Sequence, residues 1–137
     1  MARVLAMQID IPEIVAEVTA QFERYERALM ANDVDELTAL FQDDPRTIRY
    51  GGAEILYGAT EIHAFRAGRS PAGLARSLSR TLITTYGCDF AVASTLFHRS
   101  SDVGKVGRQM QTWVRTPAGW KIVAAHVSSV DEAVLGR

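Results

Sequence analysis

Apolar side chains recur along residues 10–31 at alternating steps of four and three residues. This spacing places them on one face of an α-helix. The stripe consists of Ile11, Val15, Val18, Phe22, Tyr25 and Leu29. Asp10 and Pro12 suit the start of such a helix, because aspartate caps the first turn and proline is tolerated within it. We therefore predict one long amphipathic helix that follows a flexible arm over residues 1–9.

Two shorter helices are predicted after the long one. Asp33 can cap a second helix, which ends before Pro45 because the residue that precedes a proline avoids the α region. A third helix is expected over residues 58–68, with Ile62 and Phe65 directed inward.

The remaining pattern is typical of strands. Two short runs, at residues 46–50 and 54–57, flank a pair of glycines that suits a hairpin. Four longer runs are rich in β-branched and aromatic residues and are separated by turn-forming residues. They span residues 78–86, 90–99, 105–116 and 120–130. Helices followed by a meander of strands predict an α+β fold, with residues 10–137 as a single domain. A curved antiparallel sheet wrapped around the N-terminal helix makes a cone, and pockets prefer its open mouth.

Charge and composition exclude several classes of protein. The 137 residues include 15 Lys+Arg and 16 Asp+Glu, so the chain lacks the basic excess of nucleic-acid-binding proteins. No apolar run approaches the length that spans a bilayer, and the N-terminal stretch is too short and broken for a secretion signal. Cys88 is the single cysteine, and the three histidines are dispersed. We therefore expect a cytoplasmic protein with no metal, cofactor, nucleic acid or membrane partner.

Three stretches carry a resemblance to a known family. They are VDELTALFQDDPRTIRYGGAEIL over residues 34–56, VGRQMQTWV over residues 106–114 and GWKIVAAHVS over residues 119–128. The third stretch, with its Gly-Trp-basic-Ile start and His-x-Ser end, resembles the final strand of the SnoaL-like, or cystatin-like, superfamily of α+β cones. Together with GKVGRQMQTWVRT and DPRTIRYGGAEILYG, it makes nearly the whole chain similar to the AtzH/HpxZ family.

The resemblance implies a function. Members of this family accompany amidases of nitrogen-compound catabolism, in cyanuric acid or oxalurate pathways. Their proposed activity is the conversion of 1,3-dicarboxyurea, a small anionic substrate, to allophanate by a decarboxylating amidohydrolase. The two residues proposed to carry it correspond here to Tyr25 and Arg49. A homodimer is the usual state of such cones, and Leu82, Val92, Trp113 and Val123 are candidates for its apolar interface. The alternative is a non-catalytic partner that assists an amidase.

The residues themselves leave both of these roles open. Tyr25 is either a core tyrosine bonded to a backbone carbonyl or a group that meets a ligand. Arg46 and Arg49 are an odd number of positions apart, so they point to opposite faces of the strand. We expect Arg49 inward, because it lies within the strand just before the hairpin, and Arg46 at the surface, because it directly follows the proline. A buried arginine keeps its charge and needs an anion. That anion is either the carboxylate of Asp43, Asp44 or Glu54, or a carboxylate of the substrate, which the resemblance favours.

Neutral groups on the last strands complete the expected pocket. We expect Gln109, Gln111, His126 and Ser128 to form hydrogen bonds around Arg49. The glutamines alternatively belong to a solvated sheet face or a dimer interface, and His126 to the core. Arg76 is a candidate second cation at the mouth, or an ordinary surface residue.

Overall fold

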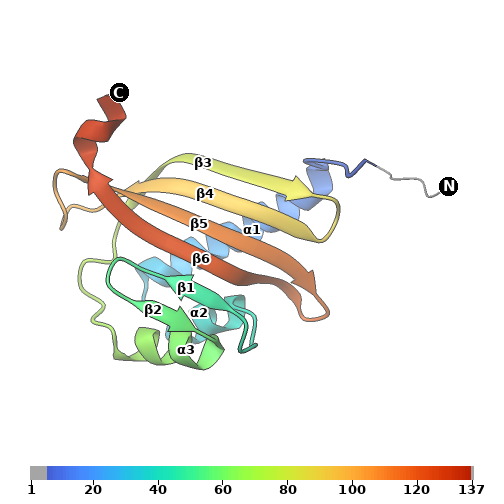
Figure 1. Cartoon of the computed structure of the whole chain (residues 1–137), viewed down its shortest axis with the longest axis horizontal. Helices are drawn as coiled ribbons and strands as arrows, with labels where there is room; N and C mark the ends of the chain where they lie inside the picture. Colours follow the sequence, from blue (N-terminus) through green and yellow to red (C-terminus); the bar gives the residue numbers. More distant parts are fainter. Residues whose placement is uncertain (1–5, 137) are drawn as a thin grey trace.

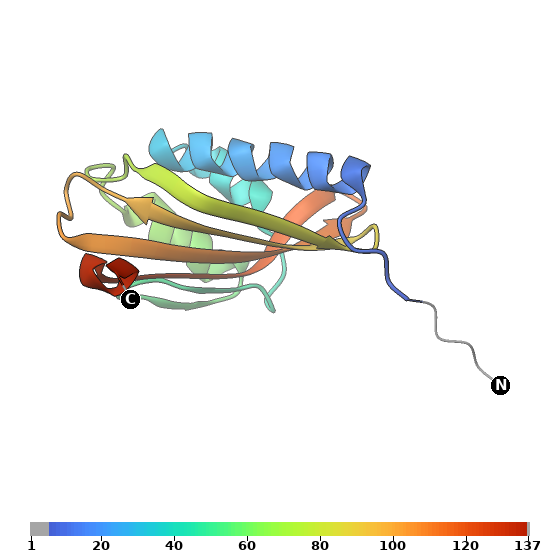
Figure 2. The same ribbon diagram turned by 90° about the horizontal axis from the view of Figure 1, so that it is seen from above.

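The computed structural model describes residues 6–136 and contains three α-helices. The helices are α1 (Pro12–Met30), α2 (Val34–Leu40) and α3 (Ala59–Gly68). Helix α1 lies along one face of the sheet, as Figures 1 and 2 show. No helix in the described part of the chain is long and apolar enough to cross a membrane.

The start of α1 differs from the prediction. The N-cap is Ile11, and no side chain caps the helix. Asp10 instead has a φ of 59° and accepts a hydrogen bond from the backbone N–H of Thr85 at 2.9 Å. On the inward face Ile14 is buried, whereas Val15 is only half-buried. The predicted flexible arm lies partly outside the described residues, and its last residue, Ile9, bridges to the end of a strand at Tyr86.

Six strands form one curved sheet in the order β2-β1-β6-β5-β4-β3. Their bounds are β1 (Ile48–Tyr50), β2 (Ile55–Tyr57), β3 (Ser77–Tyr86), β4 (Phe90–His98), β5 (Lys105–Thr116) and β6 (Gly119–Asp131), and a 3-10 turn, Glu132–Gly136, follows. All neighbouring strands are antiparallel except β1 and β6, which run parallel. The predicted α+β architecture of a sheet wrapped around a long helix is confirmed.

A bulge on β6 decides which side chains point inward. Trp113 pairs with Ile122, but the preceding residue of β5, Thr112, pairs with Ala124, so Val123 is an additional residue. Such an insertion breaks the alternation of side chains along the strand. Ile122 therefore points inward before the bulge and Ala125 after it.

The inward face of the sheet and α1 enclose the core. Its buried members include Val18 and Phe22 from α1, Leu37 from α2, and Trp113 and Ile122 from the sheet. Burial of a large apolar side chain stabilises the fold by about 1.5–3 kcal/mol.

The outer face of the sheet carries exposed apolar side chains, among them Leu82 and Met110. Trp113, which was expected there, is completely buried on the inward face. Strand β5 has no inserted residue, so Trp113 points to the same face as Gln111. A homodimer through the outer face stays a prediction, which analytical ultracentrifugation of the purified protein tests.

Candidate active site

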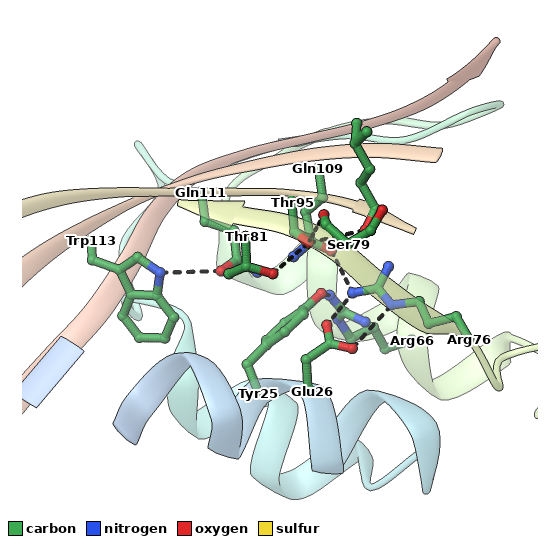
Figure 3. A network of polar contacts seen from close by, with 11 residues as sticks. Tyr25, Glu26, Arg66, Arg76, Ser79, Thr81, Thr95, Gln109, Gln111 and Trp113 are labelled. Carbon is green, nitrogen blue, oxygen red and sulfur yellow. Dashed lines mark hydrogen bonds and ion pairs between the residues drawn. The ribbon is translucent and has the colours of Figure 1, made fainter. Parts of the chain in front are cut away.

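Tyr25 lies in the interior between α1, α3 and the sheet. Its side chain is 2% exposed, and its hydroxyl oxygen accepts a hydrogen bond from Arg66 Nη2 at 3.0 Å (Figure 3). Its partner is thus a guanidinium, and not the backbone carbonyl that was one of the two alternatives. Because the phenol oxygen accepts this bond, its own proton remains available for donation to a ligand.

Positive charges around Tyr25 favour its ionised form. Burial alone raises the pKa of the phenol, but the charges of Arg66, Arg49 and Arg76 and the hydrogen bond from Arg66 outweigh it. The pKa of Tyr25 therefore lies below its ordinary value near 10. A phenol with a lowered pKa is a better proton donor near neutral pH.

Arg66 on α3 was not recognised as a site residue from the sequence. It is 1% exposed, and its guanidinium lies 5.3 Å from the centre of the Phe41 ring. Within residues 6–136, its Nε and Nη1 atoms have no hydrogen-bond partner and no carboxylate pairs with it. Its spacing of four residues from Ile62 places it on the inward face of α3, and this pattern was the available indication.

Arg49 points inward, as expected, but its charge is matched within the chain. Its side chain is buried, and Nη1 lies 2.6 Å from Glu54 Oε1. The expectation of a guanidinium free for the substrate is therefore wrong, and Glu54 is one of the three carboxylates that the sequence offered. Gly51 permits this pair, because a Cβ at this position would overlap the carboxylate of Glu54. The hairpin thus folds a carboxylate back over Arg49.

A third guanidinium lies at the same end of the interior. Arg69 follows α3, and its guanidinium lies 5.6 Å from the Phe65 ring, which Arg49 also contacts at 5.2 Å. Burial, followed by the charge of Arg66, lowers the pKa of Arg69 to about 10, so it still carries its charge at neutral pH. Its Nε and Nη2 atoms have no partner among the described residues.

Arg76 does not lie at a solvated mouth as a free cation. It is buried and forms an ion pair with Glu26, in which Nε lies 3.1 Å from Oε2. Its Nη2 atom also donates to Gln109 Oε1 at 2.8 Å. Both expected roles, ligand cation and surface residue, are therefore corrected, because α1 supplies a buried carboxylate.

Gln109 and Gln111 lie on the inward face of β5, and each is 1% exposed. Neither belongs to a solvated sheet face. Cross-strand pairing puts Gln111 opposite Ala125, and Ala125 opposite Arg49. One row of the sheet thus contains Arg49 and Gln111 with a small residue between them.

His126 and Ser128 lie on the opposite face of the sheet. The bulge at Val123 shifts the alternation, so His126 is exposed and its ring lies 6.0 Å from that of Tyr50. Ser128 Oγ accepts a hydrogen bond from Arg108 Nε at 3.2 Å on that same face. Their predicted place beside the glutamines is wrong, and His126 is not a core residue either.

A cavity of about 630 Å³ opens between α2, α3 and the turn that joins β5 to β6. Phe41, His63, Arg66 and Lys121 contribute to its lining, whereas none of the site residues inferred from the sequence does. The volume is ordinary for a small-molecule site. Arg66 therefore connects this cavity with the Tyr25 hydroxyl.

Comparison with known proteins agrees with this fold. A DUF3225-family protein from Pectobacterium atrosepticum has a similar crystal structure, with 56% identity, coverage of 90% of this chain and 95% of that chain, and a TM-score of 0.87. A cystatin-like fold protein from Burkholderia xenovorans has 48% identity, covers 92% of this chain and 98% of that chain, and gives a TM-score of 0.88.

More distant similarity extends to the fold alone. An NTF2-like protein from Pseudomonas putida is 18% identical, with coverage of 85% and 86% and a TM-score of 0.71. No protein with a curated description matches the chain. The AtzH-like family model matches residues 7–133, and the chain therefore belongs to the AtzH-like family.

Proposed function

We propose that this protein is a small decarboxylating amidohydrolase that converts 1,3-dicarboxyurea, or a similar N-carboxylated ureide, to allophanate. The observation that carries the proposal is the buried Tyr25 hydroxyl, which accepts a hydrogen bond from a buried arginine that has no carboxylate partner within residues 6–136. Membership of the AtzH-like family supports it.

Arg66 takes the role of carboxylate binding that the sequence suggested for Arg49. A buried guanidinium cannot lose its charge, and its planar fork of N–H groups suits a carboxylate. The Nε and Nη1 atoms of Arg66 have no hydrogen-bond partner within residues 6–136. A substrate carboxylate that reaches Arg66 through the 630 Å³ cavity would accept from these atoms and lie beside Tyr25. The positive charge of Arg49 would then act on Tyr25 and the substrate without a direct contact to the carboxylate.

The reaction needs a proton donor rather than a strong nucleophile. Tyr25 donates its proton to the nitrogen that carries the departing carboxylate. The C–N bond breaks, its electron pair stays on the nitrogen, and the dianion yields allophanate and CO2. The phenolate is stabilised by Arg66 and regains a proton from water. General acid catalysis of this kind contributes about 100- to 10,000-fold to the rate.

Replacement of the phenol tests this role directly. Tyr25→Phe removes the proton but keeps the ring, so turnover should fall to the spontaneous rate while the melting temperature changes little. Tyr57→Phe is the matched control, because Tyr57 is exposed on β2 and should leave turnover unchanged. Allophanate formation is measured against a protein-free sample, since carbamic acids decompose without help. Full activity in Tyr25→Phe overturns the assignment.

One observation favours a second candidate, a non-catalytic partner of an amidase. The internal Arg49–Glu54 pair occupies the arginine that the family resemblance assigns to the substrate. A binding protein with this arrangement would not accelerate substrate loss by itself. Purified protein that fails to exceed the spontaneous rate, but raises the rate of an added amidase, would support this alternative.

A further inference from the structure

The orientation of two buried amides is fixed by their neighbours. Gln109 Oε1 accepts from Arg76 Nη2 at 2.8 Å, and Gln111 Oε1 accepts from Trp113 Nε1 at 3.1 Å. Guanidinium and indole nitrogens can only donate, so each amide must turn its oxygen toward them. The NH2 group of each glutamine therefore faces away from these partners.

These two NH2 groups are buried donors for which the described part of the chain offers no acceptor. Both Nε2 atoms lack a hydrogen-bond partner among the described residues, although each side chain is only 1% exposed. An unsatisfied buried donor costs about 1–3 kcal/mol, so such groups are ordinarily paired. Rotation of either amide would not remove this cost, because it would turn the NH2 group toward a partner that can only donate.

The neighbours of Gln111 in the sheet are small. Its cross-strand neighbours on the inward face are Ala93 on β4 and Ala125 on β6, and Arg49 lies in the same row beyond Ala125. Neighbouring strands are about 4.8 Å apart, so the backbones at Gln111 and Arg49 are about 10 Å apart. Figure 3 shows Gln109 and Gln111 directed from the sheet toward the region that contains Tyr25 and Arg66.

The chemistry of the unpartnered atoms defines the ligand. In this part of the interior, the unpartnered buried atoms of Arg49, Arg66, Arg69 and the two glutamines are all N–H donors. A complementary ligand must therefore offer only acceptors toward them: charged carboxylates for the arginines and a neutral oxygen for the amides.

We propose that Gln109 and Gln111 bind a carbonyl oxygen at the centre of a small dicarboxylate, whose ends are held by the arginines, and that Trp113 positions Gln111 for this contact. The inference deepens the proposed function and rests on it for the anionic nature of the ligand. It makes the two glutamines specificity-determining residues, which distinguish a carbonyl-centred dianion from a plain one.

Two commercial dicarboxylates isolate the carbonyl contact. Acetonedicarboxylate has the skeleton of 1,3-dicarboxyurea with CH2 in place of each N–H, and glutarate is the same molecule without the central oxygen. Isothermal titration calorimetry should show acetonedicarboxylate binding about tenfold more tightly, as expected for one or two neutral hydrogen bonds. Equal affinity of the two ligands, or binding of neither, overturns the proposal.

Variants assign the preference to the amides. Gln111→Leu removes the donor, and Gln111→Glu keeps an oxygen for Trp113 while replacing the donor with an acceptor; both should reduce the ratio of affinities toward one. Trp113→Phe should reduce it in part, because Gln111 loses the contact that orients it. Gln21→Leu on α1 is the control and should keep the tenfold ratio. Circular dichroism selects folded variants, and an unchanged ratio in folded Gln111→Leu overturns the proposal.

The outcome is separable from that of the proposed reaction. Tyr25-dependent turnover without discrimination between the two ligands overturns the amide contact alone. Discrimination without turnover above the spontaneous rate overturns the enzymatic reaction and supports the contact.

Discussion

Within residues 6–136, two phenylalanine rings each contact two guanidinium groups, and at each ring one arginine has a carboxylate partner and the other has none. The Phe97 ring lies 4.5 Å from the guanidinium of Arg76 and 4.6 Å from that of Arg99. The Phe65 ring lies 5.2 Å from that of Arg49 and 5.6 Å from that of Arg69. Stacking on an aromatic ring attracts a cation but does not neutralise it.

The instructive difference is between two other buried arginines, Arg76 and Arg66, and it lies in their carboxylate partners. Beside Phe97, the buried Arg76 is paired with Glu26 and bonded to Gln109. At the other end, Arg66 adjoins Phe65 in sequence and is equally buried, but the described residues supply it with a phenol oxygen and no carboxylate. The charge of Arg76 is thus matched inside the fold, whereas Arg66 is the arginine for which we propose an anionic ligand.

We expect the largest effect on stability from breaking the ion pair between Arg76 and Glu26. Glu26→Gln leaves the charge of Arg76 buried without compensation, which costs about 3–5 kcal/mol in the free energy of unfolding. Urea denaturation measures this loss. Glu23→Gln, on an exposed position of the same helix, is the control and should stay within about 0.5 kcal/mol of the parent. A similarly small change in Glu26→Gln would contradict a structural role for the pair.

At Arg66 we expect the opposite result, a small change in stability with a loss of function. Arg66→Met replaces a buried charge that has no carboxylate partner with an apolar side chain of similar length, and should leave the free energy of unfolding within about 1 kcal/mol of the parent. Binding of dicarboxylates and turnover should nevertheless be lost. Arg66→Lys keeps the charge but not the fork, and should bind more weakly than the parent. A loss of stability in Arg66→Met as large as that in Glu26→Gln would show that the two ends are equivalent.

The charge of the unpaired end should also be visible in the titration of Tyr25. Its folded-state pKa is below the unfolded value near 10, since the attraction of Arg66, Arg49 and Arg76 exceeds the opposing effect of burial. This difference stabilises the folded protein above the unfolded pKa, and the gain is lost as the pH falls through the folded pKa.

Ultraviolet absorbance of tyrosinate measures this pKa. The difference between the parent and Tyr25→Phe isolates one phenol from the four in the chain. In Arg66→Met the Tyr25 transition should move to higher pH, because the first of the lowering charges and its hydrogen bond are removed. An unmoved transition would mean that Arg66 does not act on the phenol.

The fold was largely predictable because its determinants are local. The spacing of Phe22, Tyr25 and Leu29 defines α1 without knowledge of the sheet, and strand propensity with turn residues located β3 to β6. The predictions that were wrong concern features that depend on the pairing between strands. The bulge at Val123 is absent from any local pattern, yet it moves His126 to the outer face.

The candidate site was predictable only in part. Helical periodicity placed Tyr25 inward, and the position of Arg49 in the strand before the hairpin favoured an inward side chain; both are buried. Which carboxylate meets which guanidinium depends on tertiary contacts: Glu26 and Arg76 are 50 residues apart, and Tyr25 and Arg66 are 41 apart. The sequence therefore contained the right residue types and assigned the unpaired charge to the wrong arginine.

The smallest effect is expected at the hairpin. There Arg49 has a carboxylate partner, as Arg76 does, but its Nε atom has no partner within residues 6–136, as is also the case for Arg66. Its partner Glu54 is one-fifth exposed, so Glu54→Gln should cost only about 1 kcal/mol or less in stability. If a ligand carboxylate competes with Glu54 for Arg49, this variant should bind acetonedicarboxylate several-fold more tightly by calorimetry. Glu13→Gln, exposed on α1, controls for the change in net charge. Unchanged or weaker binding in Glu54→Gln would place Arg49 with the structural arginines, and leave Arg66 and Arg69 as the cations that meet the ligand.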